Sequence, residues 1–520
     1  MTDKKRSLLL ITVDCLRADH CGFNGYTRPT TPFLDSLAPE SVVVPNAMVA
    51  GAPTYYSLPA LLASRMPLAL GRDVVGLAPG EETLATALRQ AGYATAAFSA
   101  ANPYISPRFG YDQGFEVFCD FLDFDASAAR TQSDGKSSQG KHLRAALNRW
   151  LKNAFESAGL GWLYNELYFQ YCVRVAAPPA KSIDALRRFP SAEAVVDAAE
   201  SWLAALDSRP FFLWIHLMDP HSPYYPPAAA LRDLTGQELS PARMRYLNEF
   251  WNRSDLTPAG FERHKRDVID LYDAGILWAD RQIARLVRSL QNSNRWDDCV
   301  LALTADHGEE FLDHGRRYHA PVSLAEELAR VPLLIRVADG QNSENQRQPA
   351  SQSAGSKPDF VFSHLHLAPT LLEILNLPSP GGFQGTSLWR FLCREPATST
   401  PGIDSAQDMG PAQPAVAECV YGCTNPFHTE TLLSPRLLAV RDTRYKLVIH
   451  LQPGAVEELY DLASDPREQR PVPRGETETK EIRARLLRVA VQHLGKTTGS
   501  QPAAARLRSR LRDLQLKLQS

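Results

Sequence analysis

Short apolar runs alternate with helix-like segments along most of the chain. The apolar runs, each with few polar positions, are Leu8–Val13, Ala94–Phe98, Phe211–Leu217, Val300–Thr304 and Val331–Val337. Apolar residues recur at helical spacing in Glu82–Ala91, Ala192–Leu206 and Val268–Leu290. Buried strands separated by helices are typical of a mostly parallel sheet with helices on both faces. The pattern therefore predicts an α/β fold, in which ligands bind beyond the carboxyl ends of the strands.

A helical insertion interrupts this alternation between about residues 120 and 205. The stretch Ser127–Gly140 is rich in Ser, Gly and Gln and has no apolar periodicity. Lys141–Val175 has a helical pattern, with large aromatic side chains among basic ones. This pattern favours a packed helical insertion over a helix that lies on a membrane surface.

The last part of the chain predicts a smaller unit. Two strand-like runs, Leu437–Val440 and Tyr445–His450, are followed by helical sequence from about Thr477. We therefore expect a main domain over 1–378 and a C-terminal α+β subdomain over 379–520. The smaller unit should contain a short antiparallel sheet and terminal helices.

Composition excludes several classes of protein. The net charge of −2 gives no global attraction to nucleic acid, so no nucleic-acid partner is expected. No stretch approaches the roughly 20 apolar residues of a membrane span, so no transmembrane anchor is expected. Leu8–Val13 is shorter than a signal-peptide core of roughly 7–15 residues. The eight cysteines lack a disulfide-framework spacing, which favours reduced thiols and a cytoplasmic protein.

Polar residues follow two of the predicted strands. Asp14 comes directly after Leu8–Val13, and Asp306 and His307 follow Val300–Thr304. At the carboxyl edge of a parallel sheet, these side chains can face one site. Two carboxylates and an imidazole suit a divalent cation such as Zn, Mn, Mg or Ca. The alternative interpretation is two independent turn or helix caps.

Thr54 precedes a helical run that continues Tyr-Tyr-Ser-Leu. Its simplest role is that of a helix N-cap. The same position also allows chemistry, because a helix N-terminus favours bound anions through its free N–H groups and dipole. A hydroxyl there can attack a tetrahedral anion if a metal lowers its pKa. Thr54 is therefore both a candidate cap and a candidate nucleophile.

Four motifs occur in a fixed order along the chain. They are Val-Asp14-Cys-Leu-Arg-Ala-Asp, the Thr54 helix ending in Leu-Leu-Ala-Ser-Arg-Met-Pro, Asp219-Pro-His-Ser-Pro-Tyr-Tyr, and Asp306-His-Gly-Glu. Together they resemble the sulfatase family, within the alkaline phosphatase superfamily. The resemblance runs from about residue 7 to residue 470. It implies an alkaline-phosphatase-like α/β catalytic domain and a metal-dependent hydrolase of sulfate or phosphate esters.

The resemblance also implies roles for individual residues. It places the nucleophile on Thr54. It places the metal ligands on Asp14, Asp306 and His307, which would hold one divalent ion (Mn, Zn, Ca or Mg).

Four further positions are expected to face the substrate. The resemblance places catalytic histidines on His221 and His319, which would contact the ester oxygens and the leaving group. It also implies that His314 binds substrate. Asn102 is predicted to bind substrate because it begins the segment Asn102-Pro-Tyr104, where we expect pocket specificity to lie. His216 lies inside a predicted strand and is interpreted as structural.

The chain departs from typical sulfatases at the reacting positions. Typical members carry Cys or Ser, oxidised to formylglycine, within C/S-x-P-x-R, whereas Thr54 cannot yield the aldehyde. Cys15 and His307 stand where typical calcium sites have Asp and Asn. The set of Asp14, Thr54, Asp306 and His307 more closely resembles phosphonate monoester hydrolases and the lipoteichoic-acid and phosphoethanolamine transferases. Those transferases use a Thr nucleophile with one Mn or Zn ion.

These departures favour phosphorus chemistry. A formylglycine hydrate sheds sulfate by hemiacetal collapse, whereas an ester on Thr54 is broken by attack of water or another hydroxyl. We therefore expect hydrolysis of a small-molecule, glycan or lipid ester, with phosphate or phosphonate modestly favoured over sulfate. Two alternatives stay open: transfer of the phospho group to an alcohol, and a non-catalytic binding protein on the same fold.

Overall fold

The structure is a computed structural model that describes most of the chain. The described residues are 5–72, 74–123, 149–177, 182–337, 360–393, 413–426, 434–451, 454 and 456–497. The polar stretch Ser127–Gly140 and the start of the Lys141–Val175 segment lie outside the described residues.

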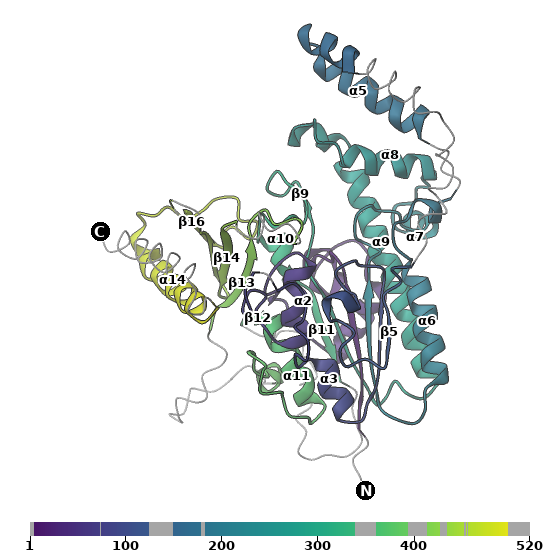
Figure 1. The fold of residues 1–520 in the computed structure, drawn as a ribbon, viewed down its shortest axis with the longest axis vertical. Coiled ribbons are helices and arrows are strands. Elements are labelled where there is room, and N and C mark those ends of the chain that lie inside the picture. Colours follow the sequence, from purple (N-terminus) through teal and green to yellow (C-terminus); the bar gives the residue numbers. More distant parts are fainter. Residues whose placement is uncertain are drawn as a thin grey trace.

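A seven-stranded sheet lies at the centre of the molecule (Figure 1), with the strand order β2-β11-β7-β1-β6-β4-β5. Its strands are β1 (Ser7–Val13), β2 (Ser41–Val43), β4 (Ala94–Ser99), β5 (Val117–Cys119), β6 (Phe211–Leu217), β7 (Cys299–Ala305) and β11 (Leu333–Arg336). The strands from β7 to β5 are parallel, whereas β11 runs antiparallel to both β7 and β2. The predicted mostly parallel sheet is confirmed, with one antiparallel strand near its edge.

Helices lie on both sides of this sheet (Figure 1), as the alternating pattern predicts. One group comprises α1 (Pro32–Leu37), α6 (Ala192–Ala205), α7 (Ala228–Thr235), α8 (Pro241–Trp251) and α9 (Pro258–Asn292). The other comprises α2 (Thr54–Ala63), α3 (Leu84–Gln90), α11 (Leu367–Ile374) and α12 (Trp389–Leu392). The helix α9 buries Val268, Leu271, Tyr272 and Ile276, a spacing that forms one apolar face.

One predicted strand, Val331–Val337, is two strands in the structure. The strand β10 (Arg330–Val331) pairs with β3 (Ala47–Met48) in a small sheet that also contains β12 (Phe362–Ser363). The strand β11 begins only after Pro332. Proline has no N–H to donate to a ladder, so the chain changes sheet at this residue.

A second, four-stranded antiparallel sheet forms near the C-terminus (Figure 1). Its strands are β13 (Ala415–Val420), β14 (Arg436–Arg441), β15 (Tyr445–His450) and β16 (Val456–Asp461), and α14 (Thr477–Thr497) packs against it. Two smaller elements belong to the part of the molecule that contains the main sheet. They are the hairpin of β8 (Glu310–Phe311) and β9 (Arg317–Tyr318), and the short helix α10 (Glu326–Ala329).

A buried ion cluster joins the C-terminal sheet to α10. Lys446 is fully buried, and its Nζ lies 3.1 Å from Glu326 Oε1 and 3.0 Å from Glu468 Oε1. Backbone packing adds to this contact, because a Cβ on Gly51 would come within 2.4 Å of the Glu418 carbonyl oxygen. The C-terminal sheet is therefore closely packed against the main part of the molecule.

The inserted segment is helical, as expected, but most of its side chains are not packed. The helix α5 (Gly161–Tyr171) projects from the body (Figure 1), and Trp150 and Trp162 are 64% and 67% exposed. Contacts with the body include the edge-on packing of Phe169 with Phe250 on α8 and the ion pair between Glu166 and Arg253. Within the part of the chain that the structure describes, no helix combines the length and apolarity needed to cross a membrane.

Candidate active site

Two carboxylates and an imidazole meet at the ends of three neighbouring strands. Asp14 follows β1, Asp306 follows β7, and His216 is the last residue but one of β6. Because these strands are adjacent and parallel, their carboxyl ends bring the three side chains together. All three are fully buried, and one ligand-type atom from each lies within 4.8 Å of the other two. The structure thus joins Asp14 to Asp306 and adds His216, which the sequence indicates only as structural.

His307 joins this group through its Nε2 atom. Its Nδ1–H donates to the carbonyl oxygen of Gly308 at 2.8 Å, which leaves Nε2 with a free lone pair in the neutral ring. This Nε2 lies 3.6 Å from Asp14 Oδ1 and 3.6 Å from Asp306 Oδ2. A Cβ on Gly308 would come within 1.8 Å of the Glu327 carbonyl oxygen, so this turn requires glycine.

Thr54 is the first residue of α2, and its hydroxyl faces the same group. Thr54 Oγ1 lies 3.2 Å from His307 Nε2, and the residue is 5% exposed. The start of this ten-residue helix favours an anion beside Thr54. A cavity of about 300 Å³ borders the hydroxyl and is lined by Pro53, Thr54, Tyr55, Asn102, Pro103, Tyr104, Met218, His221, Tyr318, His319, Ala320, Pro321 and Thr424.

The donor set at the strand ends fits a divalent cation. Among the described residues, Asp306 Oδ2 is a buried carboxylate oxygen without a hydrogen-bond partner. Such an oxygen is costly to bury, and a cation between Asp14, Asp306 and His307 would satisfy it. Carboxylates suit hard cations and imidazole suits zinc, so these residues are compatible with several metals.

Imidazole rings surround Asp14 and keep it ionised. Burial opposes the charge, but the rings of His221, His216 and His307 outweigh burial and hold the pKa of Asp14 well below its ordinary value. Asn102 Nδ2 donates to Asp14 Oδ2 at 2.8 Å, and His216 Nε2 lies 3.2 Å from the same oxygen. Asp14 is therefore a carboxylate held in one orientation, as a metal ligand needs to be.

His319 and His221 face each other with opposite pKa shifts, their ring centroids 5.0 Å apart. Burial disfavours a charged His319, but the carboxylate of Glu309, 3.1 Å from its Nδ1, outweighs burial and raises the pKa of His319 to about 9. Burial lowers the pKa of His221. Two titratable groups whose pKa values are pushed apart can act as a proton donor and a neutral partner in one site.

Replacing Glu309 by Gln should move the alkaline limb of the pH–activity profile to lower pH. Glu309 is the group that raises the pKa of His319 to about 9, so its loss returns that pKa towards the ordinary value of 6.5. If His319 works in its protonated form, activity then disappears at lower pH. The measurement is kcat/KM for a p-nitrophenyl ester between about pH 6 and pH 10.

Tyr224→Phe is the matched control for Glu309→Gln. The Tyr224 hydroxyl donates to the other carboxylate oxygen, Oε2, at 3.2 Å, so its loss leaves the charge of Glu309 in place. The limb should stay where it is in this variant. A limb that does not move in Glu309→Gln would show that His319 supplies no proton to the reaction.

Three residues with a strained backbone lie beside the site residues. Cys15, Ala101 and Tyr318 have φ angles of 61°, 57° and 68°, in the left-handed region that residues other than glycine rarely adopt. Each directly adjoins one of the site residues described above. The Tyr272 hydroxyl donates to the Cys15 carbonyl oxygen at 2.7 Å and helps to hold one of these conformations. Strain of this kind occurs preferentially where function fixes the backbone.

His314 lies apart from the other predicted site residues. Its Nε2 is 3.1 Å from Glu327 Oε2, and it lines a separate cavity of about 90 Å³ together with Glu468. The other seven predicted positions either border the cavity at Thr54 or lie in the group of carboxylates and imidazoles beside it.

Three residues at the site are absent from the sequence prediction. His216 could have been found from its place at the end of a strand that neighbours β1, and Glu309 from its place in the Asp306 motif. Cys15 could have been found from its place directly after Asp14, where typical calcium sites have Asp. Its thiol donates to Asp14 Oδ1 at 3.1 Å, and burial raises the pKa of the thiol, which keeps it protonated.

An α/β fold with a mostly parallel sheet and a site of this composition is that of an alkaline-phosphatase-like ester hydrolase. A sequence model described as Sulfatase matches residues 6–377 of the chain. The chain therefore belongs to the sulfatase family and is an ester hydrolase of that family.

The similar proteins include arylsulfatases and a multifunctional member of the alkaline phosphatase superfamily. An arylsulfatase of Clostridium perfringens is 25% identical over 424 residues, which are 74% of this chain and 78% of the relative. The multifunctional alkaline phosphatase superfamily protein PehA of Trinickia caryophylli is 25% identical over 426 residues, 75% of this chain and 77% of the relative. The chain spans half the length of arylsulfatase K of Xenopus laevis, to which it is 24% identical over 300 residues.

Solved structures share the fold. The phosphonate monoester hydrolase of Agrobacterium radiobacter superimposes with a TM-score of 0.63 at 19% identity, over 94% of this chain and 96% of that one. The structure of BT4656 in complex with its substrate D-glucosamine-2-N,6-O-disulfate gives a TM-score of 0.64 at 17% identity, over 96% and 99%. The predicted alkaline-phosphatase-like fold is confirmed.

Proposed function

We propose that the chain hydrolyses phosphate or phosphonate esters in preference to sulfate esters, through a covalent intermediate on Thr54. One observation carries this proposal: Thr54 Oγ1 lies 3.2 Å from His307 Nε2, which itself lies 3.6 Å from oxygens of both Asp14 and Asp306. The Thr54 hydroxyl therefore lies beside the carboxylates and the imidazole that fit a divalent cation.

The first half of the reaction forms the covalent intermediate. Asp14, Asp306 and His307 would hold a divalent ion, which would lower the pKa of the Thr54 hydroxyl and polarise an ester oxygen. Thr54 gives its proton to solvent and reacts as the alkoxide. The Thr54 oxygen forms a bond to phosphorus while the bond from phosphorus to the leaving oxygen breaks. His319, which is protonated at pH 7 because its pKa is about 9, gives its proton to that leaving oxygen.

The second half releases the product. Water attacks the phosphorus of the Thr54 ester and gives its proton to His319, which thereby returns to its starting state. The bond between phosphorus and the Thr54 oxygen breaks, and this oxygen is left ionised, as it was before the first step. His221 borders the same cavity and contacts the oxygens of the transferred group in both steps.

The preference for phosphorus rests on the side chain at position 54. A threonine ester has no geminal hydroxyl, so a sulfated Thr54 has no internal route of collapse and depends on attack by water. Attack at phosphorus is well served by one metal and neighbouring imidazoles. A phosphonate monoester hydrolase among the structural neighbours supports this choice, whereas the arylsulfatase among the relatives represents the competing one.

A matched series of p-nitrophenyl esters tests the preference. The same leaving group attached to phosphate monoester, phosphate diester, phosphonate or sulfate isolates the effect of the central atom on kcat/KM. We expect the best phosphorus ester to exceed the sulfate by at least about tenfold, which corresponds to about 1.4 kcal/mol of transition-state stabilisation. A sulfate that is tenfold better than every phosphorus ester would make the chain a sulfatase in its chemistry as well as in its family.

A further inference from the structure

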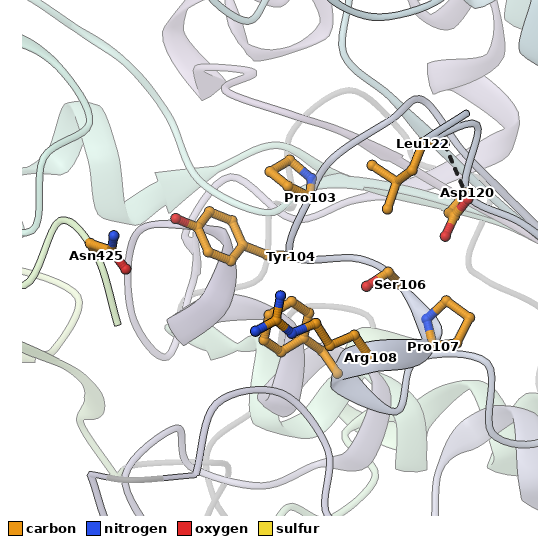
Figure 2. A pocket seen from close by; sticks show the side chains of 9 residues that line it. Pro103, Tyr104, Ser106, Pro107, Arg108, Asp120, Leu122 and Asn425 are labelled. Atoms are coloured by element: carbon orange, nitrogen blue, oxygen red, sulfur yellow. Dashed lines mark hydrogen bonds between the residues drawn. The ribbon is translucent and has the colours of Figure 1, made fainter. Parts of the chain in front are cut away.

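A second cavity of about 480 Å³ adjoins the cavity at Thr54 (Figure 2). Pro103 and Tyr104 line both cavities, so the two meet at this short segment. The same segment begins at Asn102, which donates to Asp14. A group that leaves the reacting centre along this segment therefore passes directly into the second cavity.

Aromatic side chains form one wall along the path from the cavity at Thr54 to the second cavity. The Tyr55 ring, next to the nucleophile, lies 4.8 Å from the Tyr104 ring, and Tyr104 lies 6.1 Å from Phe109. Both pairs are tilted, with interplanar angles of 56° and 50°. Aromatic faces of this kind bind flat rings by stacking.

The remaining lining is mixed in character. Leu122 adds an apolar side chain, and Figure 2 shows the Arg108 guanidinium beside the aromatic wall. Asn425 and Ser106 contribute an amide and a hydroxyl, which can bind hydroxyl or carbonyl groups of a ligand. An apolar wall with a few polar groups at its edge is typical of a small-molecule site of this volume.

We propose that the second cavity is a subsite for the leaving group and that Tyr104 selects leaving groups that carry a flat-faced ring. This inference rests on the proposed function, because the leaving group is defined by the reaction at Thr54. The substrate is then an ester of an aryl alcohol or of a sugar, since both present an apolar ring face to an aromatic side chain. An ester of a short alkyl alcohol leaves the second cavity unused.

Substitution of Tyr104 tests the stacking contact. The probes are the p-nitrophenyl and 4-methylumbelliferyl esters of phosphate or sulfate, whichever anion is turned over faster. Tyr104→Ala should lower kcat/KM for the bicyclic 4-methylumbelliferyl ester by about tenfold, the effect of one lost aromatic pair. Tyr104→Phe keeps the ring and should stay near the wild type. Tyr171→Ala, which removes a 52% exposed ring from α5, is the control for loss of a tyrosine elsewhere.

A space-filling substitution tests the volume of the cavity independently. Leu122 lines the second cavity but not the first and is 42% exposed, so a larger side chain there should be tolerated by the fold. Leu122→Trp should lower kcat/KM for the bicyclic 4-methylumbelliferyl ester more than for the monocyclic p-nitrophenyl ester. An unchanged kcat/KM for the 4-methylumbelliferyl ester in both Tyr104→Ala and Leu122→Trp would overturn the proposal.

Two binding measurements separate this proposal from the proposed function. Inhibition by inorganic phosphate, which occupies only the cavity at Thr54, should be unchanged in Leu122→Trp, because Leu122 lines only the second cavity. Binding of the 4-methylumbelliferyl ester to Thr54→Ala, followed by its fluorescence, should weaken when Tyr104→Ala is added, even if no ester is turned over. Equal binding by the single and double variants would overturn the subsite. Competition by glucose 6-phosphate that depends on Tyr104 assigns a sugar ring, and its absence assigns an aryl ring.

Discussion

Thr54→Ala should abolish ester hydrolysis while the protein stays folded and keeps its metal. Loss of a nucleophile typically lowers kcat by several orders of magnitude, and here we expect a loss of at least about 10,000-fold. The change deletes one hydroxyl with a single hydrogen bond to His307, so the expected cost in stability is only about 1 kcal/mol. The measurements are kcat for a p-nitrophenyl ester, thermal unfolding and metal content.

Ser57→Ala is the matched control for this variant. Ser57 is also buried and lies one turn further along α2, but it does not line the cavity, so its loss should leave kcat close to the wild type. Acid quenching of the wild-type enzyme during turnover should also trap a phosphorylated peptide that contains Thr54. Near-normal turnover by Thr54→Ala would show that another group attacks the substrate.

Asp306→Asn should remove the bound metal and turnover together. Loss of a group that only orients a metal ligand typically lowers metal affinity or activity about 10–100-fold. Loss of a ligand itself should therefore lower them by more than about 100-fold. The two readouts are metal content by mass spectrometry and kcat/KM. Asp267→Asn, which removes a surface carboxylate paired with Arg243, is the control and should change neither.

The metal-free proteins provide a third readout that does not depend on activity. Without a cation, the wild type holds Asp306 Oδ2 buried and without a hydrogen-bond partner beside the carboxylate of Asp14. Asparagine has nearly the same shape but no charge, so metal-free Asp306→Asn should unfold at a higher temperature than the metal-free wild type. The order should reverse when metal is added. An unchanged order would place the cation elsewhere.

The apolar pattern predicts the centre of the sheet well and its edges poorly. The limits of β6 match the predicted run, and β1 differs by one residue, because central strands are apolar on both faces. The strands β2 and β5 have only three residues each, and β5 is partly exposed, so neither forms a distinct run. The helix α9 begins ten residues before its predicted start, since its first turns are polar and partly exposed.

Site residues that follow a strand or begin a helix can be recognised from the sequence, but their partners depend on the folded chain. Asp14, Thr54 and Asp306 belong to the first kind. His314 and His319 show the limit, because only five positions separate them. The β8–β9 hairpin places His319 beside Glu309 and His314 on the side of α10. No periodicity in the sequence indicates that the side chains of His314 and His319 point to different places.

The buried ion cluster at Lys446 limits how this enzyme can recombine with its relatives. A chimera that takes its C-terminal sheet from another family member receives a new residue at this position but keeps Glu326 on α10. Unless the donor sequence also supplies a cation there, that carboxylate is buried without its lysine, at a cost of about 3–5 kcal/mol. The C-terminal sheet and α10, whose charged side chains pair with each other, should therefore be exchanged as one unit. Crossover points compatible with folding then lie before α10.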